Sequence, residues 1–127
     1  MAKKKKVSIP DLIAKARLRF HKFIRTRDEG KGCISCDKGG TENACHYYAA
    51  GSVPSMRFDE DNVHGGCVTC NKWKHGNLIE YRKGLVNRYG EDFVKVLDIK
   101  FDSYKLDGWR WEREYLENII NKYEDYK

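Results

Sequence analysis

Long apolar runs are missing from this sequence of 127 residues. No stretch approaches the roughly eighteen consecutive apolar residues that a membrane-spanning helix requires, so no membrane association is expected. The basic N-terminus also lacks the apolar segment of a secretory signal peptide. These two absences predict a cytoplasmic protein, in which paired cysteines favour metal binding over disulfides.

Acidic residues are scarce at the start of the chain. Residues 1–32 contain eleven lysines and arginines against three acidic residues, residues 33–100 nine of each, and residues 101–127 five against seven. The net charge of +6 is therefore concentrated in a basic arm, which favours a polyanionic partner, most simply nucleic acid. A solubilising tail explains Lys3 to Lys6 equally well, but the basic helix that follows less well.

A single domain is expected over residues 8–127, because the chain is short and its composition is that of a globular protein. Residues 1–7 are predicted to be a disordered basic arm. Within the domain we expect a basic helix over residues 8–30, a metal-bound unit over residues 33–76 and a helical tail over residues 77–127. The predicted fold class is α+β and mainly helical.

Helical periodicity is strong from Ser8 onward. Ser8 is predicted to cap the helix with Pro10 in its first turn, and apolar residues recur at helical spacing as far as Ile24. Gly30 and Gly32 are predicted to end the helix. Basic side chains beside the apolar stripe can bind DNA phosphates, which adds affinity without sequence information. These candidate DNA-binding residues are Arg17, Arg19, Lys22 and Arg25.

Two Cys-x-x-Cys pairs frame the centre of the chain. Cys33 and Cys36 form the first pair, and Cys67 and Cys70 form the second. Four thiolates in two such pairs have the count and spacing of one tetrahedral zinc site. A redox role for either pair is the alternative, although it does not explain why two pairs are present. Cys45 is left over and is predicted to be a small buried residue or a thiol near the site.

The pattern between the cysteine pairs is extended. Strands are predicted over residues 44–49 and 55–58, and a short helix from Cys70 to His75, ended by Gly76. Two strands followed by a helix, with a zinc ion joining the ends, predict a zinc-stapled ββα-metal unit.

The tail is predicted to contain three helices. The first opens at a capping box beginning with Asn77 and ends at Gly90, the second runs from Glu91 to about Ile99, and the third starts at residue 107 or 108. Aromatic and aliphatic residues of these helices are predicted to face the core, among them Leu78, Tyr81, Leu85, Tyr89, Phe93, Val94, Leu97, Trp109, Tyr115, Leu116, Ile119, Ile120 and Tyr123. Trp111 lies off this stripe.

Two histidines and two asparagines of the central unit have the chemistry to cut a phosphodiester. His46 on the first predicted strand can act as a general base, and Asn62 can brace that strand by hydrogen bonding. Asn71 and His75 are four residues apart on the predicted helix and can share one divalent ion, Mg²⁺ or Mn²⁺. His75 can instead cap helix carbonyls before Gly76.

The remaining polar residues of the unit have open interpretations. Lys72 and Lys74 are candidate phosphate contacts, although a solvated face explains them equally. His64 is interpreted as a support for the site or as a DNA contact. His21 is expected at the surface of the basic helix.

The central set resembles the His-Me finger (HNH) nucleases. The run Cys-x-x-Cys-Asn after a strand histidine is similar to the phage Holliday-junction resolvase endonuclease VII. Residues from about 10 to 90 most closely resemble the NinG/Rap family of lambdoid phage recombination proteins. The stretches that carry this resemblance are Phe23–Asp28, Cys33–Cys36, His46–Tyr47, Arg57–His64, Cys67–Asn71 and Gly76–Arg82.

The resemblance implies a structure-specific endonuclease that cuts branched DNA, such as Holliday junctions and D-loops, during phage recombination in the bacterial host cytoplasm. By motif position, His46 would be the base, Asn62 the middle asparagine, and Asn71 and His75 the ligands of the catalytic ion. Implied partners are branched DNA and phage or host recombination proteins. A homodimer is expected by analogy with symmetric resolvases.

A hard metal ligand is missing before His46. The family pattern places an aspartate there, whereas this chain has Glu42 to Cys45, and a cysteine suits Mg²⁺ poorly. Three alternatives are open: Glu42 or Asn43 reaches the ion, water replaces the ligand, or the site is weakened. Two other functions therefore stay open: a catalytically weak, zinc-stapled DNA-binding accessory protein, and an HNH nuclease of the nicking or restriction type.

Overall fold

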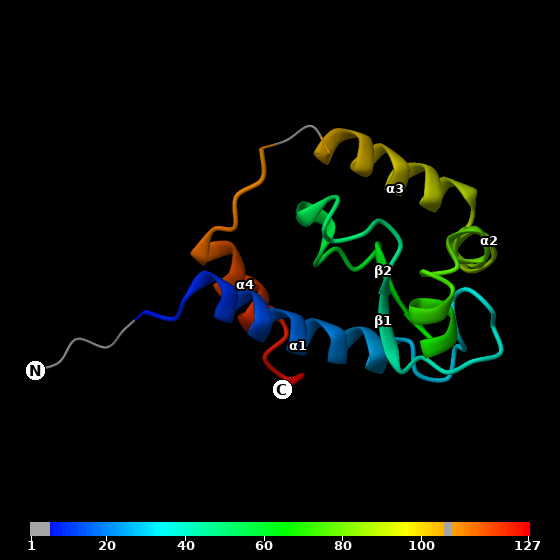
Figure 1. Ribbon diagram of the computed structural model, residues 1–127, viewed down its shortest axis with the longest axis horizontal. Coiled ribbons are helices and arrows are strands. Elements are labelled where there is room, and N and C mark those ends of the chain that lie inside the picture. Colours follow the sequence, from blue (N-terminus) through cyan, green and yellow to red (C-terminus); the bar gives the residue numbers. More distant parts are fainter. Residues whose placement is uncertain (1–5, 106–107) are drawn as a thin grey trace, which may run out of the picture.

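Four α-helices surround a two-stranded sheet in the part of the chain that the structure, a computed structural model, describes: residues 6–105 and 108–127 (Figure 1). The predicted arm at residues 1–7 falls mostly outside this part, and so does Asp107. None of the described helices is long and apolar enough to cross a membrane. The elements in chain order are α1 (Ile9–Arg27), β1 (Asn43–His46), the 3₁₀ turn η1 (Pro54–Met56), β2 (Val63–Gly66), the π-helical turn η2 (Thr69–Trp73), α2 (Leu78–Tyr89), α3 (Glu91–Tyr104) and α4 (Arg113–Lys122).

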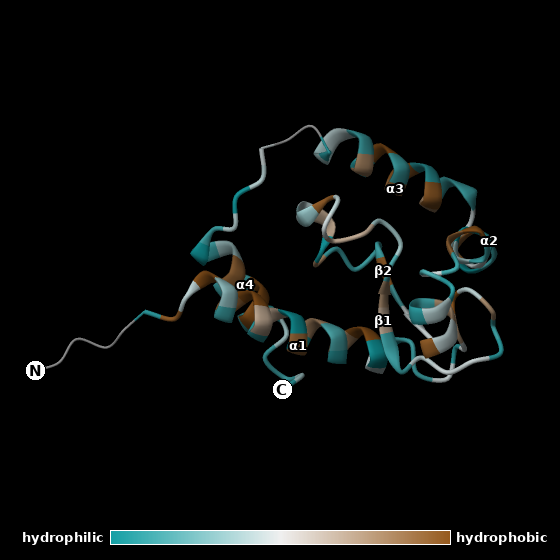
Figure 2. Cartoon of the chain, in the orientation of Figure 1, coloured by the Kyte–Doolittle hydropathy of each residue, from teal (hydrophilic) through white to brown (hydrophobic). Residues whose placement is uncertain are grey.

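Helix α1 begins as the sequence predicts. The Ser8 side chain accepts a hydrogen bond from the Asp11 N–H at 3.2 Å, and Pro10 occupies the first turn, where its missing N–H costs nothing. The predicted stripe is buried against α4, and Figure 2 shows hydrophobic residues where the two helices face each other. This first core contains Leu12, Ala16, Phe20, Ile24, Phe58, Val63, Leu116, Ile120 and Tyr123.

The β1–β2 hairpin separates this core from a second one formed with α2 and α3. The strands are antiparallel, with Cys45 opposite His64 and His46 opposite Val63. Because side chains alternate across a strand, neighbouring residues of the hairpin face different cores. Val63 packs with α1 and α4, whereas Cys45 packs with α2 and α3.

The second strand predicted over residues 55–58 is wrong. Pro54 starts a 3₁₀ turn there, and the strand that pairs with β1 is Val63–Gly66. The pair of glycines in β2 is explained by close packing. A Cβ added to Gly65 would lie 2.6 Å from the Thr41 Cβ, and one added to Gly66 would lie 2.7 Å from the Cys45 Sγ.

The helical tail differs from its prediction at several ends. The capping box at Asn77 does not form, since this residue has φ +49 and its side chain makes no capping hydrogen bond. Helix α3 extends to Tyr104, and α4 starts only at Arg113, which leaves Trp109 in the segment before it. Two residues predicted to face the core are exposed, namely Leu78 (45%) and Tyr89 (39%).

Candidate functional site

The four paired cysteines meet at one point. The Sγ atoms of Cys33, Cys36, Cys67 and Cys70 all lie within 4.8 Å of one another, and those of Cys36 and Cys67 are 3.8 Å apart. Zinc bound tetrahedrally at about 2.3 Å from each sulfur requires a sulfur–sulfur separation of roughly 3.8 Å. These four thiols therefore fit a structural zinc ion, which would tie the loop after α1 to the end of β2 and to η2.

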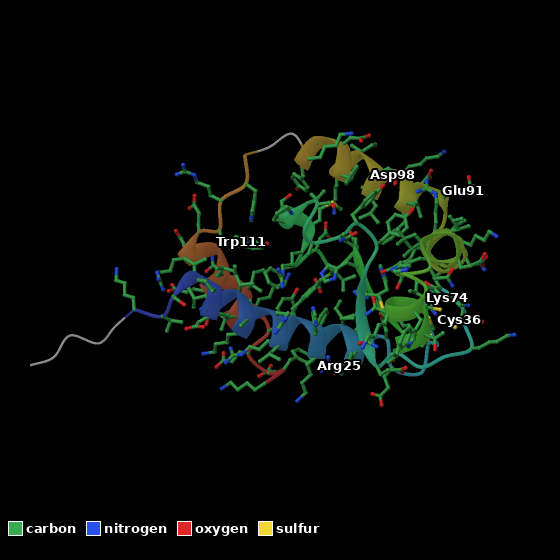
Figure 3. All side chains as sticks on the ribbon, in the orientation of Figure 1. Arg25, Cys36, Lys74, Glu91, Asp98 and Trp111 are labelled. Atoms are coloured by element: carbon green, nitrogen blue, oxygen red, sulfur yellow. The ribbon has the colours of Figure 1, made fainter. Side chains whose placement is uncertain are left out.

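The backbone around the cluster also suits thiolate ligands. The N–H of Gly39 donates to Cys36 Sγ, and the N–H of Cys70 donates to Cys67 Sγ, both at 3.4 Å. Gly39 leaves the room that the cluster needs, because an added Cβ would lie 2.4 Å from the Cys67 Cβ. Figure 3 labels Cys36 at the end of the molecule opposite Trp111. The cysteine cluster therefore lies far from the place where Trp111 packs against the first core.

Cys45 is not part of this cluster. Its side chain is 3% exposed in the second core, and the Tyr81 hydroxyl donates to its carbonyl at 2.7 Å. Burial is the main cause that raises the pKa of the Cys45 thiol to about 12. Cys45 is thus a small buried residue, and its thiol lies on the face of β1 opposite to that of His46.

His46 ends β1 on the face toward α1. Its Nε2 lies 2.9 Å from the carbonyl oxygen of Arg57, and a carbonyl only accepts, so Nε2 carries the proton and Nδ1 is unprotonated in the neutral ring. Burial lowers the pKa of His46, and the Arg57 charge lowers it further, against the opposing effect of the bond to the carbonyl. Near pH 7 the imidazole is therefore neutral, the state that a general base requires.

Asn62 is fully buried and connects the segment that follows β1 to the turn that precedes Arg57. Its Oδ1 accepts from the Tyr48 N–H at 2.9 Å, and its Nδ2 donates to the carbonyls of Tyr48 and Met56 at 2.9 and 3.1 Å. Met56 precedes Arg57, whose carbonyl holds the His46 ring. Asn62 thus fixes both the end of the strand that carries His46 and the turn that orients it.

His21 of α1 faces His46 and is not the surface residue that the sequence suggests. The two ring centroids are 5.9 Å apart, and His21 is half-buried. Burial, and after it the charges of His46, Arg17, Arg25 and Arg57, lower the pKa of His21 to about 4. No signal in the sequence links residue 21 to residue 46, because only the packing of α1 on the hairpin brings them together.

The predicted basic face of α1 divides into two parts. Arg19 donates to the Ile120 carbonyl at 2.8 Å, and Lys22 donates to the Lys127 carbonyl at 2.7 Å, so both help to hold the C-terminal segment. Arg17 and Arg25 are exposed and lie near enough to His21 to influence its charge. Figure 3 labels Arg25 on α1.

An ion pair at the end of α1 holds the hairpin in place. The buried Asp28 carboxylate accepts from Arg27 at 2.8 and 2.9 Å and from the Gly65 N–H at 2.8 Å. Arg27 also donates to the carbonyls of Glu60 and Val63. Burial alone would raise the pKa of Asp28, but these donors outweigh burial and hold it below its ordinary value. Sequence reasoning missed this pair.

The predicted arrangement of Asn71 and His75 on one helical face is wrong. Asn71 is half-buried in η2, whereas His75 is exposed beyond the end of that turn and has φ +50. Their assignment as metal ligands stays a prediction. Lys72 and Lys74 are both exposed, and the Lys72 Nζ lies 5.8 Å from the centroid of the Trp73 ring.

His64 is a core residue. It is 1% exposed, its Nδ1 lies 3.2 Å from the Tyr81 hydroxyl, and its ring packs near those of Tyr89 and Phe93. Burial is the main cause that lowers its pKa to about 3. The interpretation of His64 as a DNA contact is therefore wrong.

Comparisons with known proteins agree on one family. The family model described as Bacteriophage Lambda NinG protein matches residues 1–126. Protein ninG of Escherichia phage 933W is 37% identical over 114 residues, which cover 88% of this chain and 54% of the relative. Protein ninG of Escherichia phage lambda is 34% identical over 114 residues, covering 88% and 53%.

A third relative, protein ninG of Salmonella phage P22, is 37% identical over 102 residues, covering 79% of this chain and 49% of the relative. The chain therefore spans about half the length of the curated relatives it matches. No solved structure matches it. By the family model and these identities, the chain belongs to the NinG family of lambdoid phage proteins.

Proposed function

We propose that this chain is a divalent-metal-dependent endonuclease of the His-Me finger (HNH) type that cuts branched DNA, such as Holliday junctions and D-loops, in phage recombination. The observation that carries the proposal is the state of His46, a neutral imidazole with Nε2–H held by the Arg57 carbonyl and Nδ1 unprotonated. The chain order β1, β2, η2, with four cysteines at its ends, is what supports the ββα-metal assignment.

In the proposed reaction, Nδ1 of His46 takes a proton from a water molecule while the water oxygen bonds to phosphorus. The bond between phosphorus and one bridging oxygen breaks, and the leaving oxygen takes a proton from solvent. Asn62 keeps His46 and the Arg57 carbonyl in fixed relative positions during the reaction, since it hydrogen-bonds to the segment that follows β1 and to the segment that precedes Arg57. General-base catalysis of this kind contributes roughly 10²- to 10⁴-fold in rate.

A divalent ion, when bound, stabilises the charge on the phosphate and on the leaving oxygen. Asn71 and His75 are the proposed ligands on the ground of the family resemblance, and two protein ligands suffice for Mg²⁺ when substrate phosphates and water complete its shell. The carboxylates before and after His46 are already engaged: Glu42 accepts from the Val68 N–H at 3.2 Å, and Asp59 pairs with Lys100 at 3.2 Å. Beyond the four cysteines, the described residues hold no other group of three or more His, Cys, Asp or Glu ligand atoms.

A second candidate is a zinc-stapled DNA-binding accessory protein with weak or no catalysis. The observation that favours it is the lack of a carboxylate beside His46 on β1. The adjacent residue, Cys45, faces the other core, and the Glu42 carboxylate is bonded to Val68.

Cleavage of a labelled four-way junction and of a linear duplex of matched sequence tests the proposal. The metal-free arm omits Mg²⁺ and Mn²⁺ rather than adding a chelator, because a chelator would also remove structural zinc. We expect the zinc-loaded protein to cut the junction only with Mg²⁺ or Mn²⁺ and to leave the duplex intact. Equal cleavage of both substrates selects the nicking or restriction type, and binding without cleavage selects the accessory protein.

A further inference from the structure

Positively charged side chains from two segments converge beside His46. On α1, Arg17, His21 and Arg25 are spaced four residues apart and therefore share one face of the helix. His21 of this face lies against His46, with ring centroids 5.9 Å apart. Arg57, which follows η1, also lies beside these two histidines. Its carbonyl oxygen is hydrogen-bonded to the His46 ring, and its charge acts on His21.

Arg57 differs from Arg27 and Arg19, the half-buried arginines of α1, and from Arg88, whose Nη1 is also buried without a partner but whose Nη2 donates to the carbonyls of Lys31 and Gly32. Arg27 is paired with Asp28 at 2.8 Å and donates to two carbonyls, and Arg19 donates to the Ile120 carbonyl. Arg57 Nε, in contrast, is buried without a hydrogen-bond partner in the residues that the structure describes. A buried donor of this kind ordinarily has a partner, so its isolation calls for an explanation.

The charges around Arg57 and His21 are of one sign. Burial is the main cause that lowers the pKa of His21, and the charges of Arg17, Arg25 and Arg57 lower it further. Burial and the Arg17 charge lower the pKa of Arg57. Like charges held this close repel, and an anion bound among them would relieve the repulsion. Guanidinium groups suit phosphate in particular, because their forked N–H donors match two phosphate oxygens.

We propose that Arg17, His21 and Arg57 bind the DNA phosphate that is to be cut, opposite Nδ1 of His46. Arg57 donates its unpaired Nε–H to a non-bridging oxygen of this phosphate, and the neutral His21 ring donates its N–H to the same phosphate. Arg17 binds the phosphate from its solvent-exposed side. This inference rests on the proposed function and adds to it the residues that hold the substrate. It also makes α1 part of the proposed active site, in addition to its role as a non-specific basic surface.

Cleavage kinetics test the roles of the two arginines. Arg57→Gln and Arg17→Gln are compared with Lys15→Gln, which removes one charge from an exposed position of the same helix. With the protein in excess over the junction and above the dissociation constant, we expect Arg57→Gln to lower the single-turnover rate by about 100-fold, Arg17→Gln by about 10-fold, and Lys15→Gln by less than about 2-fold. Equal rates for all three variants, each shown to be folded, would overturn the assignment.

The ionisation of His21 gives a readout that does not depend on cleavage. Its ring resonances are followed by NMR in zinc-loaded protein between pH 5 and 7.5, with and without a small four-way DNA junction and with no added Mg²⁺. In free protein the ring should stay neutral over this range, because its pKa is about 4. A bound phosphate should raise that pKa to above about 5, so that the ring titrates in the complex with parent and Lys15→Gln protein but much less with Arg57→Gln.

The two experiments separate the two proposals. If the parent protein does not cleave but His21 responds to DNA, the phosphate site stands and the nuclease proposal fails. If the parent cleaves while His21 does not respond and the arginine variants cleave normally, the phosphate site is wrong and the nuclease proposal stands.

Discussion

His46 and His64 lie one register position apart on the same hairpin, but they differ in their burial, their contacts and the charges beside them. His64, 1% exposed, is closed in by Tyr81, Tyr89 and Phe93 on the side of α2 and α3. His46 faces α1, with its ring held by a carbonyl and with cations beside it. Burial lowers the pKa of both rings, so a shifted pKa alone does not identify a catalytic histidine.

The neighbours are what distinguish the two rings. His64 Nδ1 bonds to the Tyr81 hydroxyl, which itself donates to the Cys45 carbonyl, and aromatic rings enclose the His64 ring. Around His46, Nδ1 is unprotonated and the nearby Arg57 Nε is without a partner among the described residues. We infer that the His64 face maintains the fold and that the His46 face carries the chemistry. Changes on the two faces should therefore have different kinds of effect.

The largest effect is expected at the zinc cluster, where the hairpin ends. Cys67→Ser should abolish zinc binding and unfold the central unit, because metal affinity of about 10 kcal/mol or more is folding free energy in small zinc sites. Zinc content by mass spectrometry and thermal unfolding by circular dichroism measure this. Cys45→Ser is the matched control and should keep its zinc, since Cys45 lies outside the cluster. A Cys67→Ser protein with the parent's melting temperature would contradict the account.

A smaller loss is expected at the ion pair that fixes α1 to the hairpin. Asp28→Ala leaves Arg27 and the Gly65 N–H without their buried acceptor, which should lower the free energy of unfolding by about 3 kcal/mol. Urea unfolding measures this. Asp61→Ala breaks an exposed pair with Lys100 and should cost less than about 1 kcal/mol. Equal losses in the two variants would mean that the buried pair does not hold the hairpin.

The smallest effect is the pH dependence that His64 contributes. Its folded pKa of about 3 is below the unfolded value of about 6.5, so between these values only the unfolded state binds the proton. Stability should therefore fall as pH drops through this range, by about 1 kcal/mol between pH 7 and pH 5.5. His21, whose folded pKa is about 4, also makes the protein less stable as the pH drops. In zinc-saturated His64→Gln protein the fall should be smaller by about that amount, and an unchanged fall would contradict the burial of His64.

Local signals in the sequence predicted the parts of this molecule that depend on neighbours along the chain. The cap at Ser8, the stripe of α1 and the four-cysteine cluster were correct, because spacing alone defines them. The second strand was misplaced for a physical reason. Met56 and Phe58 are both buried but in different cores, whereas residues two apart on a strand would face the same core, and Pro54 starts a 3₁₀ turn there.

The candidate site was only partly predictable. His46 and Asn62 were selected by their chemistry and by the family resemblance, whereas the contact of His21 with His46 and the unpaired Arg57 Nε arise from the packing of distant segments. The two glycines of β2 weaken a strand by propensity and are required here by the side chains they approach. No local pattern reports such contacts.

Junction cleavage by His46→Ala, compared with parent and His64→Gln protein, tests the central claim most directly. The three proteins are matched for zinc content, folded fraction and junction binding before the single-turnover rate is measured with Mg²⁺. The account predicts that His46→Ala loses roughly 10²- to 10⁴-fold in rate while His64→Gln keeps the parental rate per folded molecule. A folded His46→Ala protein that cuts the junction as fast as the parent would contradict it.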